Sequence, residues 1–178
     1  MTDEKSMTLG TDYAGQDVRG WYVTEKLRDV RAFWDGFNLW TRGGRIIAAP
    51  EWFTRGLPYG VPLDGGVYAG RCQVETIARL AVQNGRWIEG THTFQVYDAP
   101  AVVGDYPERM KVARALSSVT THVHAVAVST VRNLNELRRL AVRIIGEGGE
   151  GLMLRNPSVT SYEQGLTGNL LKLKTVFI

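Results

Sequence analysis

Residues 21–42 read WYVTEKLRDVRAFWDGFNLWTR, and their aromatic and aliphatic residues come in short runs separated by charged residues. The Asp35-Gly36 pair lies between two aromatic-rich segments, and such a pair favours the tight turn of a β-hairpin. Another apolar run, RIIAA, follows at residues 45–49. The stretch therefore predicts antiparallel β-structure, with the ordered part of the chain beginning at Gly20.

Helices and strands are both predicted along the rest of the chain. Apolar residues repeat about every 3.6 positions in residues 73–83, which favours a helix that ends at Asn84-Gly85. Pro107 suits the first turn of a second helix. Predicted helices cover 73–83, 106–116 and 134–145, predicted strands cover 87–98, 122–128, 151–155 and 169–174, and residues 50–71, which are rich in proline and glycine, are predicted to be a loop. The pattern predicts an α+β fold of mostly antiparallel sheets with flanking helices.

Composition is typical of a globular protein. The chain has 178 residues, of which 44% are hydrophobic, so it can bury the core of one domain, expected over residues 20–178. The polar residues 1–19 are expected to form a flexible arm. No run approaches the roughly 18 apolar residues of a membrane helix, and the acidic start is unlike a signal peptide, so we expect a cytoplasmic protein. The single cysteine, Cys72, excludes an intramolecular disulfide, and the net charge of +3 is compatible with a nucleic-acid partner.

Lys26 is a candidate nucleophile in the first predicted strand. A lysine amine attacks only when it is neutral, and partial desolvation near other cations, such as Arg28 and Arg31, favours the neutral form. Taken alone, Lys26 is more simply interpreted as an exposed strand lysine. The surrounding motifs favour the first interpretation.

Five segments, in chain order, resemble the collinear motifs of the ATP-dependent DNA ligases. These enzymes belong to the covalent nucleotidyltransferase superfamily, which also contains RNA ligases and mRNA-capping enzymes. Lys26 and Arg31 are in register with the family's nucleophile motif, K-x-D-G-x-R. The likeness is nearest to the small bacterial and phage ligases and spans about residues 20–174. The segments are TEKLRDVRAFWDG (24–36), WTRGGRIIAAPEWF (40–53), LDGGVYAGR (63–71), FQVYDAP (94–100), and the final pair GGEGLMLRNP (148–157) and NLLKLK (169–174).

The resemblance implies a nucleotidyltransferase (adenylation) domain, ATP-grasp-like in fold, of an ATP-dependent DNA ligase. Lys26 would attack the α-phosphate of ATP, form a lysine-AMP adduct, and pass AMP to the 5′-phosphate of nicked double-stranded DNA, as in DNA repair and replication. Phe94 and Met153 would enclose the adenine ring from its two faces. Lys172 and Lys174, on one face of the last strand, would hold the α-phosphate as catalytic groups.

The resemblance also implies roles for the remaining candidate residues. Thr24 and Glu25 would lie against the nucleotide, and Arg31 would contact its ribose or the nick. Glu150 would help to hold Mg²⁺, since carboxylate oxygens suit that ion. Contacts to the DNA backbone are expected from four arginines, Arg42, Arg45, Arg55 and Arg71. No membrane is expected as a partner, and the protein is expected to act as a monomer.

Three places depart from the family pattern. Arg28 and Asp29 stand where the family has Asp and Gly, so the acid is displaced by one position. In a strand, that displacement would turn the carboxylate to the opposite face. Gly66 replaces a glutamate of the third motif, and Leu166-Thr167 stands where relatives often have Arg-Ser.

The sequence stops four residues after Lys174. The oligonucleotide-binding (OB) domain that normally follows in these ligases is therefore expected to be absent. Together with the departures, this leaves two alternatives open. One is a catalytically impaired ligase-like module that binds nucleotide or nicked nucleic acid, and the other is an RNA ligase or capping-type nucleotidyltransferase.

Overall fold

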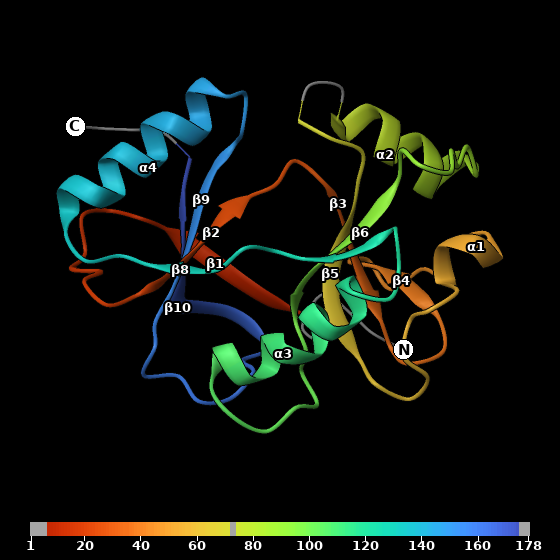
Figure 1. Ribbon diagram of the computed structural model, residues 1–178, viewed down its shortest axis with the longest axis horizontal. Helices are drawn as coiled ribbons and strands as arrows, with labels where there is room; N and C mark the ends of the chain where they lie inside the picture. The colour runs from red at the N-terminus through yellow and green to blue at the C-terminus, as the bar shows by residue number, and fades with distance from the viewer. Residues whose placement is uncertain (1–6, 72–73, 175–178) are drawn as a thin grey trace.

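The computed structural model of the protein describes residues 7–71 and 74–174, and in them ten strands form two sheets flanked by four helices (Figure 1). The strands are β1 (Thr8–Asp12), β2 (Tyr22–Lys26), β3 (Val30–Trp34), β4 (Leu39–Thr41), β5 (Leu63–Tyr68), β6 (Thr93–Asp98), β7 (Val123–Ala125), β8 (Ser129–Thr130), β9 (Gly151–Arg155) and β10 (Gly165–Leu173). The helices are α1 (Glu51–Thr54), α2 (Val74–Asn84), α3 (Tyr106–Ser117) and α4 (Leu134–Gly146). The α+β prediction is confirmed.

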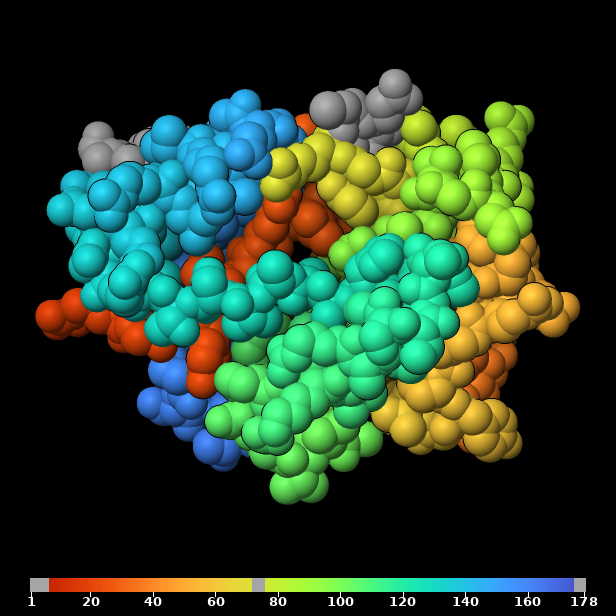
Figure 2. All heavy atoms as spheres, viewed as in Figure 1, coloured from red at the N-terminus to blue at the C-terminus, as the bar shows by residue number. Residues whose placement is uncertain are grey.

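Each sheet has five strands, and the chain passes between the sheets. The first sheet has the order β1-β10-β9-β2-β8 and the second the order β4-β3-β5-β6-β7. Most neighbours are antiparallel, as predicted, whereas β1 with β10 and β6 with β7 are parallel. Residues 27–29 lead from β2 in the first sheet to β3 in the second, and residues 126–128 lead back from β7 to β8. Figure 2 shows the surface hollowed between the two halves that these segments join.

Each sheet has its own apolar core. On the first sheet, α4 buries Leu137, Ala141 and Ile144, which lie on one face because they are spaced four and three residues apart. They pack in one cluster with Val23 of β2 and Leu154 of β9. The second sheet packs against α3, which lies on β6 and β7. The two cores hold the sheets as separate walls of the space between them.

The turn and the helix ends that the sequence predicted are found in the structure. Asp35 accepts hydrogen bonds from the N–H groups of Phe37 and Asn38, and the hairpin joins β3 to β4 as predicted. Gly36 has φ of 100°, which favours glycine. The three longer helices agree with the predicted ranges to within about two residues, the scatter normal for helix ends. Pro107 lies in the first turn of α3.

The predicted flexible arm over residues 1–19 is wrong for the described part, residues 7–19. Thr8–Asp12 form β1, an edge strand paired with β10. Met7 and Val18 are buried. Polar composition suggested an arm, but backbone pairing and two apolar anchors dock this segment on the first sheet. Residues 1–6 of the predicted arm lie outside the described residues.

The predicted loop over residues 50–71 is also wrong, because it contains α1 and the central strand of the second sheet, β5. The Asp64-Gly65-Gly66 sequence, typical of a turn, lies inside that strand. Glycine is required there for steric reasons: a side chain at Gly65 would overlap the carbonyl oxygen of Gln95 on the neighbouring strand β6. Close approach of the neighbouring strand, rather than a turn, explains this glycine.

Three strands differ in length from their predicted ranges. The predicted 87–98 is paired as β6 only from Thr93, and of the predicted 122–128 only Val123–Ala125 form a strand, β7; the separate β8 begins at Ser129, beyond that range. β10 begins at Gly165, earlier than predicted, and ends at Leu173. Among the described residues, no helix is both long and apolar enough to cross a membrane.

Candidate nucleotide-binding site

A cavity of about 310 Å³ lies between the two sheets. Its walls come from β1, β2, β3, β6, β9, β10, the start of α3 and the segment 27–29, so they combine residues from both ends and the middle of the chain. Lining residues that carry the site are Tyr22, Thr24, Glu25, Lys26, Asp29, Arg31, Arg42, Tyr97, Tyr106, Met153, Arg155 and Lys172. Seven of the residues predicted from the sequence therefore meet in one cavity.

Lys26 is the last residue of β2 and lines this cavity. Its Nζ lies 2.6 Å from Oε1 of Glu150, and both side chains are mostly buried, with 18% and 23% of their surfaces exposed. Lys26 pairs across the sheet with Gly151, the residue after Glu150. A side chain at Gly151 would overlap the carbonyl oxygen of Leu173, so this glycine lets β9 start close against β10. Strand register thus brings together two residues 124 positions apart in the sequence.

The cavity has aromatic walls, but Phe94 is not one of them. Phe94 is fully buried in the core of the second sheet, where its ring lies 6.5 Å from that of Phe53. Successive residues of a strand face opposite sides, so Phe94 and Tyr97, three positions apart, cannot share a face. Tyr97 lines the cavity instead. The structure therefore corrects the placement of Phe94 beside adenine.

Three tyrosines, a methionine and several leucines supply the apolar surface. Tyr22 of β2 and Tyr106 at the start of α3 lie with ring centroids 5.8 Å apart. Met153, on β9 opposite Thr24 of β2, lines the cavity as predicted. A flat ring and a polarizable thioether are suited to contact a planar base.

Arg31 is fixed within the wall by a two-bond ion pair. Its Nε and Nη2 donate to the two carboxylate oxygens of Asp64 at 2.9 and 2.6 Å, and Nη2 also donates to the carbonyl of Thr8 at 3.1 Å. The guanidinium carbon lies 5.4 Å from the ring centroid of Tyr97. Burial opposes its charge, but attraction to Asp64 prevails and raises the pKa of Arg31. Arg31 therefore remains charged at the cavity, with its Nε and Nη2 donors engaged by protein groups.

Asp64 has a second donor, which belongs to the loop before β10. Tyr162 donates its hydroxyl to Oδ2 of Asp64 at 2.8 Å. Burial raises the pKa of the Tyr162 hydroxyl, so it remains a neutral donor. The cluster connects the two sheets, because Arg31 and Asp64 belong to the second sheet while Thr8 and the Tyr162 loop border the first.

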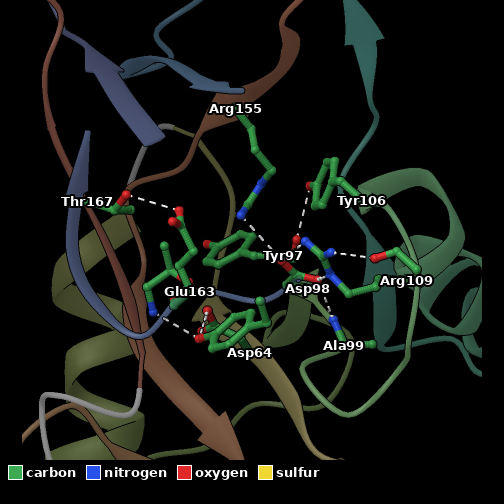
Figure 3. A network of polar contacts seen from close by, with 12 residues as sticks. Asp64, Tyr97, Asp98, Ala99, Tyr106, Arg109, Arg155, Glu163 and Thr167 are labelled. Atoms are coloured by element: carbon green, nitrogen blue, oxygen red, sulfur yellow. Dashed lines mark hydrogen bonds and ion pairs between the residues drawn. The ribbon is translucent and has the colours of Figure 1, made fainter. Parts of the chain in front are cut away.

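A second polar network, which the sequence had not pointed to, lies under the aromatic wall (Figure 3). Asp98 is fully buried and accepts from Nε and Nη2 of Arg109 at 2.7 and 3.1 Å, and from the N–H of Ala99 at 2.9 Å. Arg155 lies 3.4 Å from the same carboxylate, with its guanidinium carbon 4.4 Å from the centroid of Tyr106. Burial raises the pKa of Tyr106 to about 12. The network orients Arg155 at the cavity, and the available sequence signals for it were Asp98 and Arg155 themselves, which lie in the motif segments 94–100 and 148–157.

The two lysines of the last motif separate in the structure. Lys172 lines the cavity, and its Nζ lies 3.4 Å from Oδ1 of Asp12 on β1. Lys174 follows the end of β10 and is exposed. The structure therefore places only Lys172 of this pair on the cavity wall.

The four arginines expected at DNA occupy different surroundings. Arg42 lines the cavity. Arg71 donates to both carboxylate oxygens of Glu25 at 2.9 and 2.7 Å and to Glu147 at 2.7 Å. Arg55 pairs with Glu51 at the surface, and Arg45 is exposed.

Comparison with known proteins points to one group of enzymes, although no family model matches the chain. It is 30% identical over 166 residues to the DNA ligase of Haemophilus influenzae, covering 92% of this chain and 61% of that enzyme. The chain thus spans about three fifths of the curated relative. A solved Lig E DNA ligase structure superposes with a TM-score of 0.81 at 29% identity, covering 96% of this chain and 68% of that one.

More distant structures share the fold. Chlorella virus DNA ligase-adenylate gives a TM-score of 0.77 at 19% identity, with 96% of this chain and 67% of that one covered. The ATP-dependent DNA ligase of bacteriophage T7 gives 0.71 at 16% identity, with 96% and 68% covered. In sequence the chain is therefore similar to DNA ligases, and it shares the fold of solved ATP-dependent DNA ligase structures.

Proposed function

We propose that this protein carries out the adenylation chemistry of an ATP-dependent DNA ligase, with Lys26 as the nucleophile. The supporting observation is that Lys26 and Lys172 line one cavity with aromatic walls and that Glu150 lies 2.6 Å from the Lys26 amine. A cavity of this kind, with a few convergent polar groups, is typical of a small-molecule site. The homology to DNA ligases points to ATP as the small molecule and to nicked DNA as the acceptor.

In the proposed reaction, the neutral amine of Lys26 attacks the α-phosphorus of ATP. The bond from that phosphorus to the bridging oxygen breaks, and pyrophosphate leaves with the electron pair. Lys172, also at the cavity, offsets the charge that develops on the α-phosphate oxygens. Transfer of AMP to a DNA 5′-phosphate then frees Lys26 and prepares the nick for joining by its 3′-hydroxyl.

Glu150 has two uses in this proposal. At 2.6 Å it holds the Lys26 amine at the cavity and can accept its proton. Its carboxylate oxygens also suit Mg²⁺, and an ion bound there would offset phosphate charge and favour the neutral amine. Thr24 and Met153, opposite each other on β2 and β9, would contact the nucleoside. Arg42 faces the same cavity, so its expected DNA contact would lie close to the reacting phosphate.

Protein labelling tests the first step. The protein is incubated with Mg²⁺ and ATP labelled at the α-phosphorus, together with Lys26→Ala and with Lys111→Ala, an exposed lysine paired with Glu108. We expect label on the wild type and on the Lys111 variant, and none on Lys26→Ala. Equal labelling without Lys26 would refute its role.

Joining is tested separately, because the chain spans three fifths of its curated relative. Nicked DNA that already carries 5′-AMP bypasses the first step, and its sealing would show the later chemistry. Binding of this DNA without sealing or labelling would instead favour a non-catalytic module. A parallel nick with an RNA acceptor strand distinguishes DNA from RNA joining. We propose that the protein acts as a cytoplasmic monomer. Size-exclusion chromatography with light scattering measures its molar mass in solution and so tests the oligomeric state.

A further inference from the structure

Position 66 and the Asp29 carboxylate compete for one space. Gly66 lies in β5 opposite Arg31 of β3, and a Cβ built on Gly66 would overlap Oδ2 of Asp29. The backbone at Gly66 does not have a positive φ, so a larger residue is excluded by Asp29 rather than by backbone conformation. A side chain can therefore occupy this space from position 29 or from position 66, but not from both.

Asp29 reaches this space because it lies in the segment between the sheets. Residues 27–29 are not part of a strand, so the strand alternation expected from the sequence does not apply to Asp29. Its carboxylate lines the cavity, and Tyr97 donates its hydroxyl to Oδ2 at 2.7 Å. Burial raises the pKa of Asp29 to about 6, although the hydrogen bond from Tyr97 and the charges of Arg31 and Lys26 oppose the rise. At neutral pH this is a carboxylate held in place on the cavity wall.

The chemistry of this carboxylate selects the part of ATP that it can contact. Phosphate oxygens are repelled by its charge. The permanent charge of nearby Arg31 disfavours a divalent cation at the same point. Neutral hydroxyl donors fit best, since a charged acceptor strengthens their hydrogen bonds. On ATP, these donors are the 2′- and 3′-hydroxyls of the ribose.

We infer that Asp29 binds the ribose hydroxyls of ATP and that Gly66 is glycine to make room for it. The inference rests on the proposed function for the identity of the nucleotide. The two departures from the ligase motifs at these positions are then a single exchange, in which one carboxylate has moved to the other side of a shared space.

Binding of sugar analogues tests the contact. Affinities for ATP, 2′-deoxy-ATP and 3′-deoxy-ATP are measured by calorimetry for the wild type, Asp29→Ala and the exposed control Asp17→Asn. A hydroxyl bound to a charged acceptor should be worth about 10- to 100-fold in affinity. We expect the wild type and the control to prefer ATP by that factor over at least one analogue, and Asp29→Ala to lose most of the preference. Undiminished preference in Asp29→Ala, or none in the wild type, would overturn the inference.

The exchange itself is tested by moving the carboxylate. Gly66→Glu alone should lose stability and ATP affinity, because its side chain overlaps Asp29. In the double variant Asp29→Gly/Gly66→Glu the space is free, and we expect both the thermal midpoint and the ribose preference to recover. If Gly66→Glu does not fold, recovery of folding in the double variant still reports on the shared space. A double variant no better than Gly66→Glu would refute it.

These readouts separate this inference from the proposed function. If the wild type prefers ATP over a deoxy analogue but is never labelled, the ribose contact is supported and adenylation is refuted. If the wild type is labelled on Lys26, and Asp29→Ala is labelled as well as the wild type by ATP and by both deoxy analogues, adenylation is supported and the ribose contact is refuted.

Discussion

Replacing Asp98 by Asn should strongly destabilise the protein. Asp98 and Arg109 both have no exposed surface, and the pair is joined by bonds of 2.7 and 3.1 Å. Asn has nearly the same shape, so the change removes the charge while leaving the packing almost intact. Arg109 is then left as a buried cation without its counter-ion.

The expected loss follows from that burial. Removing one partner of a buried ion pair costs about 3–5 kcal/mol of unfolding free energy. For a chain of this length, each kcal/mol lowers the thermal midpoint by about 2–4 °C, so the midpoint should fall by roughly 6–20 °C. Arg155, which shares the carboxylate at 3.4 Å, should also lose its position over Tyr106. ATP affinity of the variant, measured below its midpoint, should therefore fall as well.

Urea unfolding followed by circular dichroism measures the loss. Glu51→Gln is the control, because it removes an ion pair with Arg55 that lies at the surface, and its midpoint should stay near that of the wild type. Adding Arg109→Met to Asp98→Asn should restore part of the stability, since the unpaired cation is then gone. A loss below about 1 kcal/mol for Asp98→Asn would show that the buried pair does not hold the fold in this way.

Three further predictions follow from the geometry. In the folded state the pKa of Asp29 is raised from 3.8 to about 6, so the folded protein holds this proton at pH values where the unfolded chain has lost it. The wild type should therefore lose stability relative to Asp29→Asn as pH rises from about 4 to about 6. A difference in unfolding free energy that does not change with pH would contradict this. Phe94→Ala should lower the free energy of unfolding, measured in urea, by about 3–5 kcal/mol. Tyr97→Phe should mainly weaken the preference for ATP over the deoxy analogues in calorimetry. The reverse pattern would indicate that Phe94, and not Tyr97, lies at the cavity. Gly10→Val places a Cβ 2.7 Å from the Leu170 carbonyl oxygen and should weaken the pairing of β1 with β10. Amide hydrogen exchange in residues 8–12 should therefore become faster. Unchanged exchange would argue against β1 as a paired strand.

Local sequence signals predicted much of the fold correctly. The hairpin at Asp35-Gly36 depends on turn chemistry, and α4 depends on a repeat of apolar residues, so each is encoded within about a dozen neighbouring positions. Collinear motifs likewise indicated Lys26 and Glu150. The structure brings their side chains within 2.6 Å of each other because β2 and β9 are neighbours in the first sheet.

Long-range packing decided what local signals could not. β1 is a strand because its backbone groups pair with β10, more than 150 residues away, and the polar sequence of the first residues carries no trace of that partner. Phe94 and Tyr97 both match an aromatic position, but the side of β6 that faces the cavity is set by the sheet as a whole.

By itself, the sequence determined the α+β class, the order of the motifs and the residue types available for nucleotide chemistry, because these depend on neighbouring residues and their order along the chain. Only the tertiary structure decided which of those residues meet. Asp29 and Gly66, 37 positions apart, were two unrelated departures in the sequence. They are one feature in the fold, because two atoms cannot occupy the same space and only the packed sheets bring these two positions into contact.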